Sequence, residues 1–141
     1  MRHSLNRVEV IELPTFRDAE RGALTVAEPG TSIPFSISRV FYLHGLPSGS
    51  ERGAHAHRKS EQIFIAVSGS FTLNLTNGSD SREYEMNDPV RAVFVPPMIW
   101  ARLHGFSEDA VCLVLTNSLY DPADYIHDWN EFASHASQVR S

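Results

Sequence analysis

The sequence has a single cysteine and no surplus of positive charge. Cys112 has no partner for an intrachain disulfide, and its apolar neighbours favour a buried thiol over a reactive nucleophile. The chain carries 12 lysine and arginine residues against 17 aspartate and glutamate residues, a formal net charge of −5. That balance argues against a general affinity for nucleic acid or anionic membranes, but it is compatible with a local basic pocket for one phosphorylated ligand.

Long apolar runs are also missing. No run approaches the length of a transmembrane helix, and residues 1–7 lack the apolar segment of a signal peptide. We therefore expect no membrane partner and a cytoplasmic location. With 141 residues, of which 42% are hydrophobic, the chain is long enough to bury a core, and we expect a single domain over residues 1–141.

Short β-prone runs separated by glycine, proline and asparagine make up most of the chain. About ten such runs follow one another at intervals of roughly 8–12 residues, which is typical of a sandwich or barrel. Residues 71–76 alternate between apolar and polar side chains, and the Asn77-Gly78 pair after them indicates a hairpin. Only the tail has helical features, because Asp128 and Glu131 have the spacing of a capping box. The prediction is an all-β fold with a short C-terminal helix.

The stretch with the clearest chemistry contains His55 and His57. If this stretch is extended, both imidazoles point to the same side, because side chains alternate along a strand. The apolar run at 62–67 follows, and it is predicted to be a buried strand that ends at the turn Ser68-Gly69. Two histidines that project from a β scaffold into one cavity suit either a metal site or proton transfer.

This region resembles the first signature of the cupin superfamily, which is carried here by Gly49, His55, His57, Gln62 and Gly69. The resemblance implies a double-stranded β-helix, or jelly roll. Metal-binding cupins typically have a glutamate where Gln62 stands and a third histidine at the position of Ala101. Two neutral imidazoles offer a divalent ion too few strong donors and no anionic charge. We therefore expect no metal site and no cofactor.

A narrower resemblance covers nearly the whole chain. Its motifs, in chain order, are Arg21-Gly22-x-Leu24-Thr25, Pro34-Phe35, Arg39-Val40-Phe41-Tyr42, Arg52-Gly53-x-His55-Ala56-His57, Gln62, Val95-Pro96-Pro97-Met98-Ile99-Trp100 and Tyr120-Asp121-x-x-Asp124-Tyr125-Ile126. They resemble the dTDP-4-keto-6-deoxyglucose 3,4-ketoisomerases, also called WxcM-like sugar 3,4-ketoisomerase cupins. The resemblance implies a metal-independent homodimer that isomerises a nucleotide-linked keto sugar in deoxysugar biosynthesis, with residues 5–13 crossing to the partner's sheet.

The reaction implied by this resemblance moves a carbonyl from C4 to C3 of the sugar. It requires removal of the C3 proton, an enediolate, and protonation of C4. A neutral histidine with a pKa near about 6.5 suits such proton transfer, and by its place in the motif we expect His55 to be the base. The developing oxyanion needs a donor, which His57, Tyr42 or Arg52 could supply. The expected catalytic residues are therefore His55, His57 and Tyr42.

The expected substrate-binding residues are Arg52, Arg21, Gln62 and Trp100. Two of them have an equally good plain interpretation, since Trp100 could plug the mouth of the barrel and Arg21 could be a solvated turn residue. Four residues near the tail are expected to be structural: Asp121 and Asp124 as caps and turn formers, Tyr120 and Tyr125 as core or dimer contacts.

The chain departs from the family pattern at two places. Family members usually carry a basic or imidazole side chain directly after the tryptophan, where this chain has Ala101. Their tail usually continues Tyr-Asp-Glu and Ile-Arg, where this chain has Pro122 and His127. Two other functions therefore stay open. One is an epimerase-like cupin, which needs a similar base but inverts carbons and keeps the carbonyl in place. The other is a sugar-nucleotide-binding cupin without turnover, for which Ala101 is the motivating feature.

Overall fold

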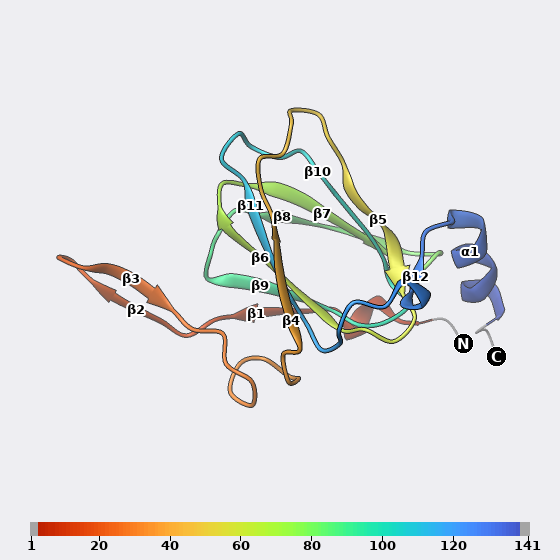
Figure 1. Cartoon of the computed structure of the whole chain (residues 1–141), viewed down its shortest axis with the longest axis horizontal. Coiled ribbons are helices and arrows are strands. Elements are labelled where there is room, and N and C mark those ends of the chain that lie inside the picture. Colours follow the sequence, from red (N-terminus) through yellow and green to blue (C-terminus); the bar gives the residue numbers. More distant parts are fainter. Residues whose placement is uncertain (1–2, 139–141) are drawn as a thin grey trace.

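The computed structural model describes residues 3–138 as two five-stranded antiparallel sheets that face each other (Figure 1). The first sheet has the order β1 (Glu9–Glu12), β9 (Arg91–Val95), β6 (Gln62–Ser68), β11 (Val111–Thr116) and β4 (Arg39–Leu43). The second has the order β12 (Tyr125–Ile126), β5 (Arg52–His57), β10 (Trp100–His104), β7 (Phe71–Thr76) and β8 (Ser81–Met86). The expected all-β class is confirmed.

The main core lies between the two sheets. Along β7 the side chains of Phe71, Leu73 and Leu75 are buried and alternate with half-buried polar ones, as residues 71–76 predict. They pack against the inward side chains of the first sheet, among them Phe64 and Val114. The two sheets therefore enclose one apolar layer, and a cavity is left only where that layer is incomplete.

The Asn77-Gly78 pair forms the expected hairpin loop between β7 and β8. The Asn77 side-chain oxygen accepts hydrogen bonds from the backbone N–H groups of Ser79 (2.9 Å) and Asp80 (2.8 Å). Gly78 has a φ of 95°, which residues with a Cβ rarely adopt. Local turn chemistry therefore sets the register of this strand pair.

A second hairpin, formed by β2 (Thr15–Asp18) and β3 (Gly22–Thr25), projects away from the two sheets (Figure 1). Among residues 3–138 its strands pair only with each other, and Phe16 is the register partner of Leu24. Both side chains are largely exposed, 66% for Phe16 and 60% for Leu24. The hairpin thus carries apolar surface that its own chain does not cover.

Residues 5–13 do not reach beyond their own chain in this structure. They form a short 3-10 helix, η1 (Leu5–Arg7), and then β1, which pairs with β9 at the edge of the first sheet. Val10 and Ile11 lie opposite Val93 and Ala92 in that ladder. The edge of β9 is thus paired within the chain, and the hairpin that follows this segment projects from the sheets. The crossing of residues 5–13 to a partner's sheet stays a prediction.

The tail forms a 3-10 turn, η2 (Pro122–Asp124), then β12 and finally a helix, α1 (Trp129–Gln138), at the end of the molecule opposite the projecting hairpin (Figure 1). The Asp128 carboxylate accepts a hydrogen bond of 3.0 Å from the Glu131 backbone N–H, so the expected helical cap is confirmed. No helix among residues 3–138 is long and apolar enough to cross a membrane.

Candidate active site

A cavity of about 190 Å³ opens between the two sheets on the side of β4, β5 and β12. Its lining comes from six strands and consists of Phe41, Leu43, Arg52, Gly53, His55, Gln62, Phe64, Ala101, Leu103, Val114 and Tyr125. Most of these side chains are apolar. The polar groups that reach the cavity are one guanidinium, one imidazole, one amide and one phenol, which is a typical composition for a site that binds and orients a small ligand.

His55 stands on β5 with its ring held in one tautomer. The Nδ1 atom lies 2.9 Å from the carbonyl oxygen of Gly53. Because a carbonyl only accepts, Nδ1 carries the proton and Nε2 is left free to accept one. Burial, and then the neighbouring His57, lower the pKa of His55 from 6.5 to about 4. The imidazole is therefore neutral at physiological pH.

The strand bends directly before His55. Gly53 has a φ of 83° and Ala54 a φ of 51°, and the register with β10 shifts at the same level. A Cβ at Gly53 would lie 2.9 Å from the Ala101 carbonyl oxygen, so only glycine fits this close approach. The bend brings the Gly53 carbonyl under the His55 ring, where its oxygen accepts a hydrogen bond from the Nδ1–H group.

His57 lies behind the cavity wall and is buried. Its Nδ1 donates a hydrogen bond of 2.9 Å to the Asp124 carboxylate, which also accepts one from the Ser60 hydroxyl and one of 2.7 Å from the Lys59 backbone N–H. Its Nε2 is buried and has no hydrogen-bond partner among the described residues. The ring centroid of His57 is 5.0 Å from that of His55.

The protonation states of this pair follow from burial and hydrogen bonding. Burial lowers the pKa of His57 more than the Asp124 carboxylate raises it, so the imidazole is neutral. Burial raises the pKa of Asp124, but the hydrogen bonds from Ser60, His57 and Lys59 outweigh it and the net shift is downward. A neutral His57 therefore donates its one N–H to an ionised Asp124.

Tyr125 completes the wall beside both histidines. Its ring centroid is 4.9 Å from that of His55 and 4.4 Å from that of His57. His127 stacks on the same ring, with an interplanar angle of 8° and a centroid distance of 5.3 Å, and lies 5.5 Å from the His55 ring. Three imidazoles and a phenol thus form one contiguous aromatic cluster.

Comparison with known proteins places this arrangement in a family. The family model described as FdtA, WxcM-like, C-terminal matches residues 6–137. The chain belongs to this family. It is 35% identical over 119 residues, which are 84% of this chain and 86% of the other, to the TDP-4-oxo-6-deoxy-α-D-glucose-3,4-oxoisomerase of Aneurinibacillus thermoaerophilus.

Two solved structures of ketoisomerases superpose on nearly the whole chain. QdtA, a sugar 3,4-ketoisomerase from Thermoanaerobacterium thermosaccharolyticum solved with TDP, is 32% identical with a TM-score of 0.92, covering 96% of this chain and 98% of its own. WlaRA, a TDP-fucose-3,4-ketoisomerase from Campylobacter jejuni, is 31% identical with a TM-score of 0.88, covering 94% and 98%. The two facing sheets are therefore the cupin double-stranded β-helix, as the sequence predicts.

Within this family fold, three of the seven expected site residues line the cavity: Arg52, His55 and Gln62. The side chain of Gln62 is buried at the start of β6 and points the same way as Phe64. Ala101 also faces the cavity, as the register partner of His55, so the departure from the family pattern falls inside the site. His57 shares the face of His55 but lies behind it.

Tyr42 does not reach the cavity of its own chain, which corrects its expected catalytic placement. Phe41 and Leu43 point inward from β4, so the alternation of the strand turns Tyr42 outward, where it is 60% exposed beside His44. The sequence shows which residues of the strand share a face, but it does not show which of the two faces the rest of the protein covers.

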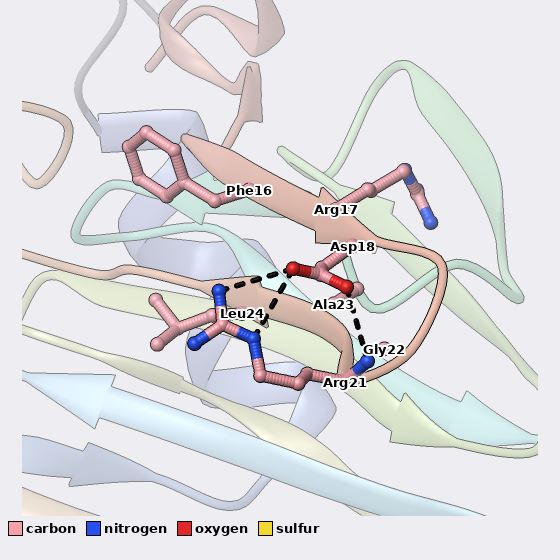
Figure 2. A pocket seen from close by; sticks show the side chains of 7 residues that line it. All are labelled: Phe16, Arg17, Asp18, Arg21, Gly22, Ala23 and Leu24. Atoms are coloured by element: carbon pink, nitrogen blue, oxygen red, sulfur yellow. Dashed lines mark hydrogen bonds and ion pairs between the residues drawn. The ribbon is translucent and has the colours of Figure 1, made fainter.

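Arg21 and Trp100 also lie away from the cavity. Arg21 is at the tip of the projecting hairpin and forms an exposed ion pair of 3.0 Å with Asp18 (Figure 2). Trp100 points away from the neighbouring Ala101, and its ring packs at 5.3 Å from Trp129 and 5.4 Å from Phe132. Trp100 thus packs against α1, is not among the residues that line the cavity, and does not plug the mouth of the barrel. Within one chain, Arg21 is the solvated turn residue of its plain interpretation.

Sequence reasoning missed Asp124 and Tyr125 as parts of the site. Asp124 was expected to be a cap and Tyr125 a core or dimer contact, yet the first holds His57 and the second lines the cavity. Both fall in the tail motif of the family, which is the one signal that could have pointed to them. Their contacts with β5 span more than sixty residues of chain, so no local pattern predicts them.

Proposed function

We propose that this protein is an isomerase that moves the carbonyl of a TDP-linked 4-keto-6-deoxyhexose from C4 to C3. The observation that carries the proposal is the neutral His55, which lines the cavity of a chain in the ketoisomerase family and whose Nε2 is unprotonated. The similar QdtA was solved with TDP, and a variant of it with TDP-4-keto-6-deoxyglucose. These ligands support a nucleotide-linked keto sugar as the substrate.

In the proposed reaction His55 Nε2 removes the proton from C3. The electron pair of that C–H bond forms a C3–C4 double bond, and the C4 carbonyl becomes an oxyanion. Arg52, which lines the cavity near His55, stabilises that negative charge. The enediolate then takes the proton back at C4, while the C3 hydroxyl gives its proton to the C4 oxyanion and becomes the carbonyl. One proton is returned for each one removed, so no external oxidant or reductant is needed.

A neutral His55 is in the form that a base must have, although a pKa of about 4 makes it a weak one. An anionic substrate bound next to the imidazole favours its protonated form and therefore raises this pKa. The cavity thus keeps the base neutral when empty and makes it more basic when occupied. Gln62, the amide in the lining, is proposed to hydrogen-bond a sugar hydroxyl.

His57 and Asp124 support the base from behind. The carboxylate fixes the orientation and tautomer of His57, whose ring packs against both His55 and Tyr125. We assign His57 a positioning role, because its Nε2 is buried behind the wall that the substrate would contact. Replacement of His57 should therefore impair turnover less than replacement of His55.

The deciding experiment is NMR of TDP-4-keto-6-deoxyglucose incubated with the protein in D₂O. A carbonyl signal that moves to C3, with deuterium entering the ring, is the expected result. Ring carbons that invert while the carbonyl stays at C4 would instead identify an epimerase. Line broadening of the sugar nucleotide without any turnover would identify a binding protein.

We further propose that the protein is a homodimer in which the projecting hairpin packs on a second copy. A two-stranded hairpin is marginally stable alone in water, and this one exposes Phe16 and Leu24 (Figure 2). The edge strand β4 of the same chain exposes Val40 and Tyr42. Two separate apolar surfaces on one chain fit a two-fold contact in which each copy provides both.

We also propose a single domain that acts without a cofactor in the cytoplasm. Cys112, the one cysteine, is buried and unpaired, and burial raises the pKa of its thiol to about 12. A buried, protonated thiol without a disulfide partner is compatible with the reducing environment of the cytoplasm.

A further inference from the structure

His127 stands opposite His55, the base of the proposed reaction, on the neighbouring strand. The strand β12 pairs antiparallel with β5, and Tyr125 is the register partner of His57 (Figure 1). The same register, continued by two residues, places His127 opposite His55. Side chains directly opposite each other in an antiparallel pair share one face of the sheet and are close neighbours. The ring centroids of the two histidines are accordingly 5.5 Å apart.

The ring of His127 is held by one aromatic neighbour and is open to solvent. It stacks on the ring of Tyr125 with an interplanar angle of 8° and a centroid distance of 5.3 Å. His127 is exposed, whereas His55 is half-buried and His57 is buried. The stack therefore fixes the plane of a solvent-accessible imidazole at the rim of the cavity, beside two residues that line it, His55 and Tyr125.

His55 can exchange a proton at only one of its ring nitrogens. Its Nδ1–H is hydrogen-bonded to the Gly53 carbonyl, so a proton taken from the sugar must arrive at Nε2 and leave from it. During the proposed reaction the ligand fills the cavity that His55 lines. Acting alone, His55 would return to C4 the same hydrogen that it removed from C3. A solvent proton reaches C4 only if a second group passes it to His55 while the enediolate is bound.

The other groups around His55 in the described part of the chain are unsuited to this exchange. His57 is buried behind the cavity wall. The other polar side chains that line the cavity are those of Arg52, Gln62 and Tyr125. A guanidinium, an amide and a phenol do not readily take up a proton near neutral pH, whereas an imidazole both takes up and releases one. His127 is therefore the neighbour that combines the right chemistry with access to solvent.

The electrostatic coupling of the two histidines suits a transfer between them. Burial and then His57 lower the pKa of His55 most strongly, and a charge on His127 lowers it further. A proton on one imidazole thus disfavours a proton on the other, so the pair holds one proton that can move between the rings. Proton transfer needs hydrogen-bond contact or one intervening water, and rings 5.5 Å apart are within reach of one bridging water.

We propose that His127 exchanges the proton of His55 with solvent during turnover. The His55 Nε2–H bond breaks, the unprotonated ring nitrogen of His127 accepts that proton, directly or through one water, and its other ring nitrogen releases a proton to solvent. The reverse sequence delivers a solvent proton to His55 Nε2 and then to C4, so protons balance and no electrons are transferred. His127 acts on the sugar only through His55 and is therefore not a catalytic residue. This inference rests on the proposed function, because it takes His55 as the base of that reaction.

The test is isomerisation of TDP-4-keto-6-deoxyglucose in D₂O, stopped at low conversion and followed by ¹H NMR. It measures the initial rate and the fraction of product with deuterium at C4, and a sample without protein corrects for uncatalysed exchange. Most of the wild-type product should carry deuterium at C4. His127→Phe keeps the stack on Tyr125, and His127→Gln keeps a polar side chain, but neither can relay a proton. In both variants most of this deuterium should be lost, because His55 then returns the original hydrogen.

The rate separates this role from a structural one. Turnover in the His127 variants should fall far less than the about 10²–10⁴-fold expected for loss of the base, and the KM should not change. A merely structural residue would lower the rate without altering the deuterium content per turnover. His44→Phe is the matched control, because His44 is also an exposed histidine beside a tyrosine, 5.4 Å from the outward-facing Tyr42. Its rate and deuterium content should equal those of the wild type.

The inference is wrong if the wild-type product retains the C3 hydrogen at C4, or if folded His127→Phe and His127→Gln proteins incorporate as much deuterium as the wild type. Thermal melting decides whether each variant is folded, and the glutamine variant carries the test if the phenylalanine variant is not. Either result, with the carbonyl still moving to C3, would overturn this inference alone. Deuterium that enters at C3 in a His127-dependent manner, while the carbonyl stays at C4, would overturn the proposed function alone.

Discussion

The Nδ1 atom of His57 lies 2.9 Å from the Oδ2 atom of Asp124, with both side chains buried. This contact joins β5 to the 3-10 turn η2, although the two residues are 67 positions apart in the chain. Asp124 also accepts hydrogen bonds from Ser60 and from the Lys59 backbone, so both carboxylate oxygens are occupied by donors. The carboxylate therefore holds the wall behind His55 in one arrangement.

Asp124→Asn should disturb the tautomer of His57. An asparagine has one acceptor oxygen where aspartate has two, so its NH₂ group must face either the Lys59 N–H or the His57 Nδ1 proton, and both are donors. We expect a loss of about 1–3 kcal/mol in the free energy of unfolding. Isomerisation should fall about 10- to 100-fold, by analogy with the partners that orient metal-bound histidines. The ¹⁵N chemical shifts of the His57 ring report the tautomer directly.

Asp121→Asn is the matched control for this variant. Asp121 lies in the same turn and accepts only an exposed hydrogen bond from the Ala123 backbone N–H, which an asparagine oxygen can also accept. In this variant the ¹⁵N chemical shifts of the His57 ring and the rate of turnover should equal those of the wild type. Unchanged His57 shifts and full activity in a folded Asp124→Asn protein would show that Asp124 has no positioning role.

His55→Asn should abolish most of the proton transfer. Asparagine preserves the approximate size and the hydrogen-bonding character of the side chain but cannot act as a base, so deuterium entry and carbonyl migration should fall together by about 10²–10⁴-fold. TDP binding, measured by calorimetry, should be retained. His57→Asn should be less damaging. Near wild-type turnover in His55→Asn would move the base to another residue of the cluster.

The pH dependence of stability should reveal the depressed pKa of His55. The folded-state pKa of about 4 lies below the ordinary value of 6.5, so the unfolded chain binds a proton first as the pH falls. His55 therefore contributes its full stability above pH 6.5, and this contribution is lost progressively toward pH 4. Between about pH 7 and about pH 4.5 we expect a loss of about 2 kcal/mol from this residue.

Urea unfolding of the wild type and of His55→Asn at both pH values measures this contribution. The variant lacks the titrating imidazole, so its free energy of unfolding should fall less on acidification than that of the wild type. Parallel losses in the two proteins would contradict a depressed pKa at His55.

Phe16→Asp combined with Leu24→Asp should convert the proposed dimer into monomers. The two residues face each other across the hairpin, and burying two carboxylates in a contact between copies is unfavourable. Multi-angle light scattering at micromolar concentration checks the mass. Ser79→Asp, in the exposed turn between β7 and β8, adds charge away from the hairpin and should leave the mass unchanged. A wild-type protein that is folded and monomeric at this concentration would refute the proposal.

Chelators should leave the activity unchanged. Gln62 and Ala101 offer an amide and a methyl group at two positions that metal-binding cupins use for ligands, and no group of three His, Cys, Asp or Glu side chains within residues 3–138 gathers around a common point. The measurement is turnover before and after dialysis against EDTA, with elemental analysis of the purified protein. About one transition metal per chain, with activity lost on its removal, would count against this.

The sequence by itself determined the fold class and the centre of the site. Alternation of apolar residues and turn chemistry are local properties, so β7, its Asn77-Gly78 hairpin and the cap of α1 could be predicted. The period of two along a strand also placed His55 and His57 on one side. The spacing of the family motifs predicted that Gln62 and Ala101 face the same cavity, as they do.

The tertiary structure alone decided which face of each strand is covered and which distant residues meet. Parity groups Tyr42 with Val40, but only the packing of β4 against the core turns that row outward and gives Phe41 and Leu43 to the cavity. Asp124 and Tyr125 reach the histidines because β12 pairs with β5. These contacts join segments far apart in the chain, and side-chain patterns within one segment carry no information about its partner.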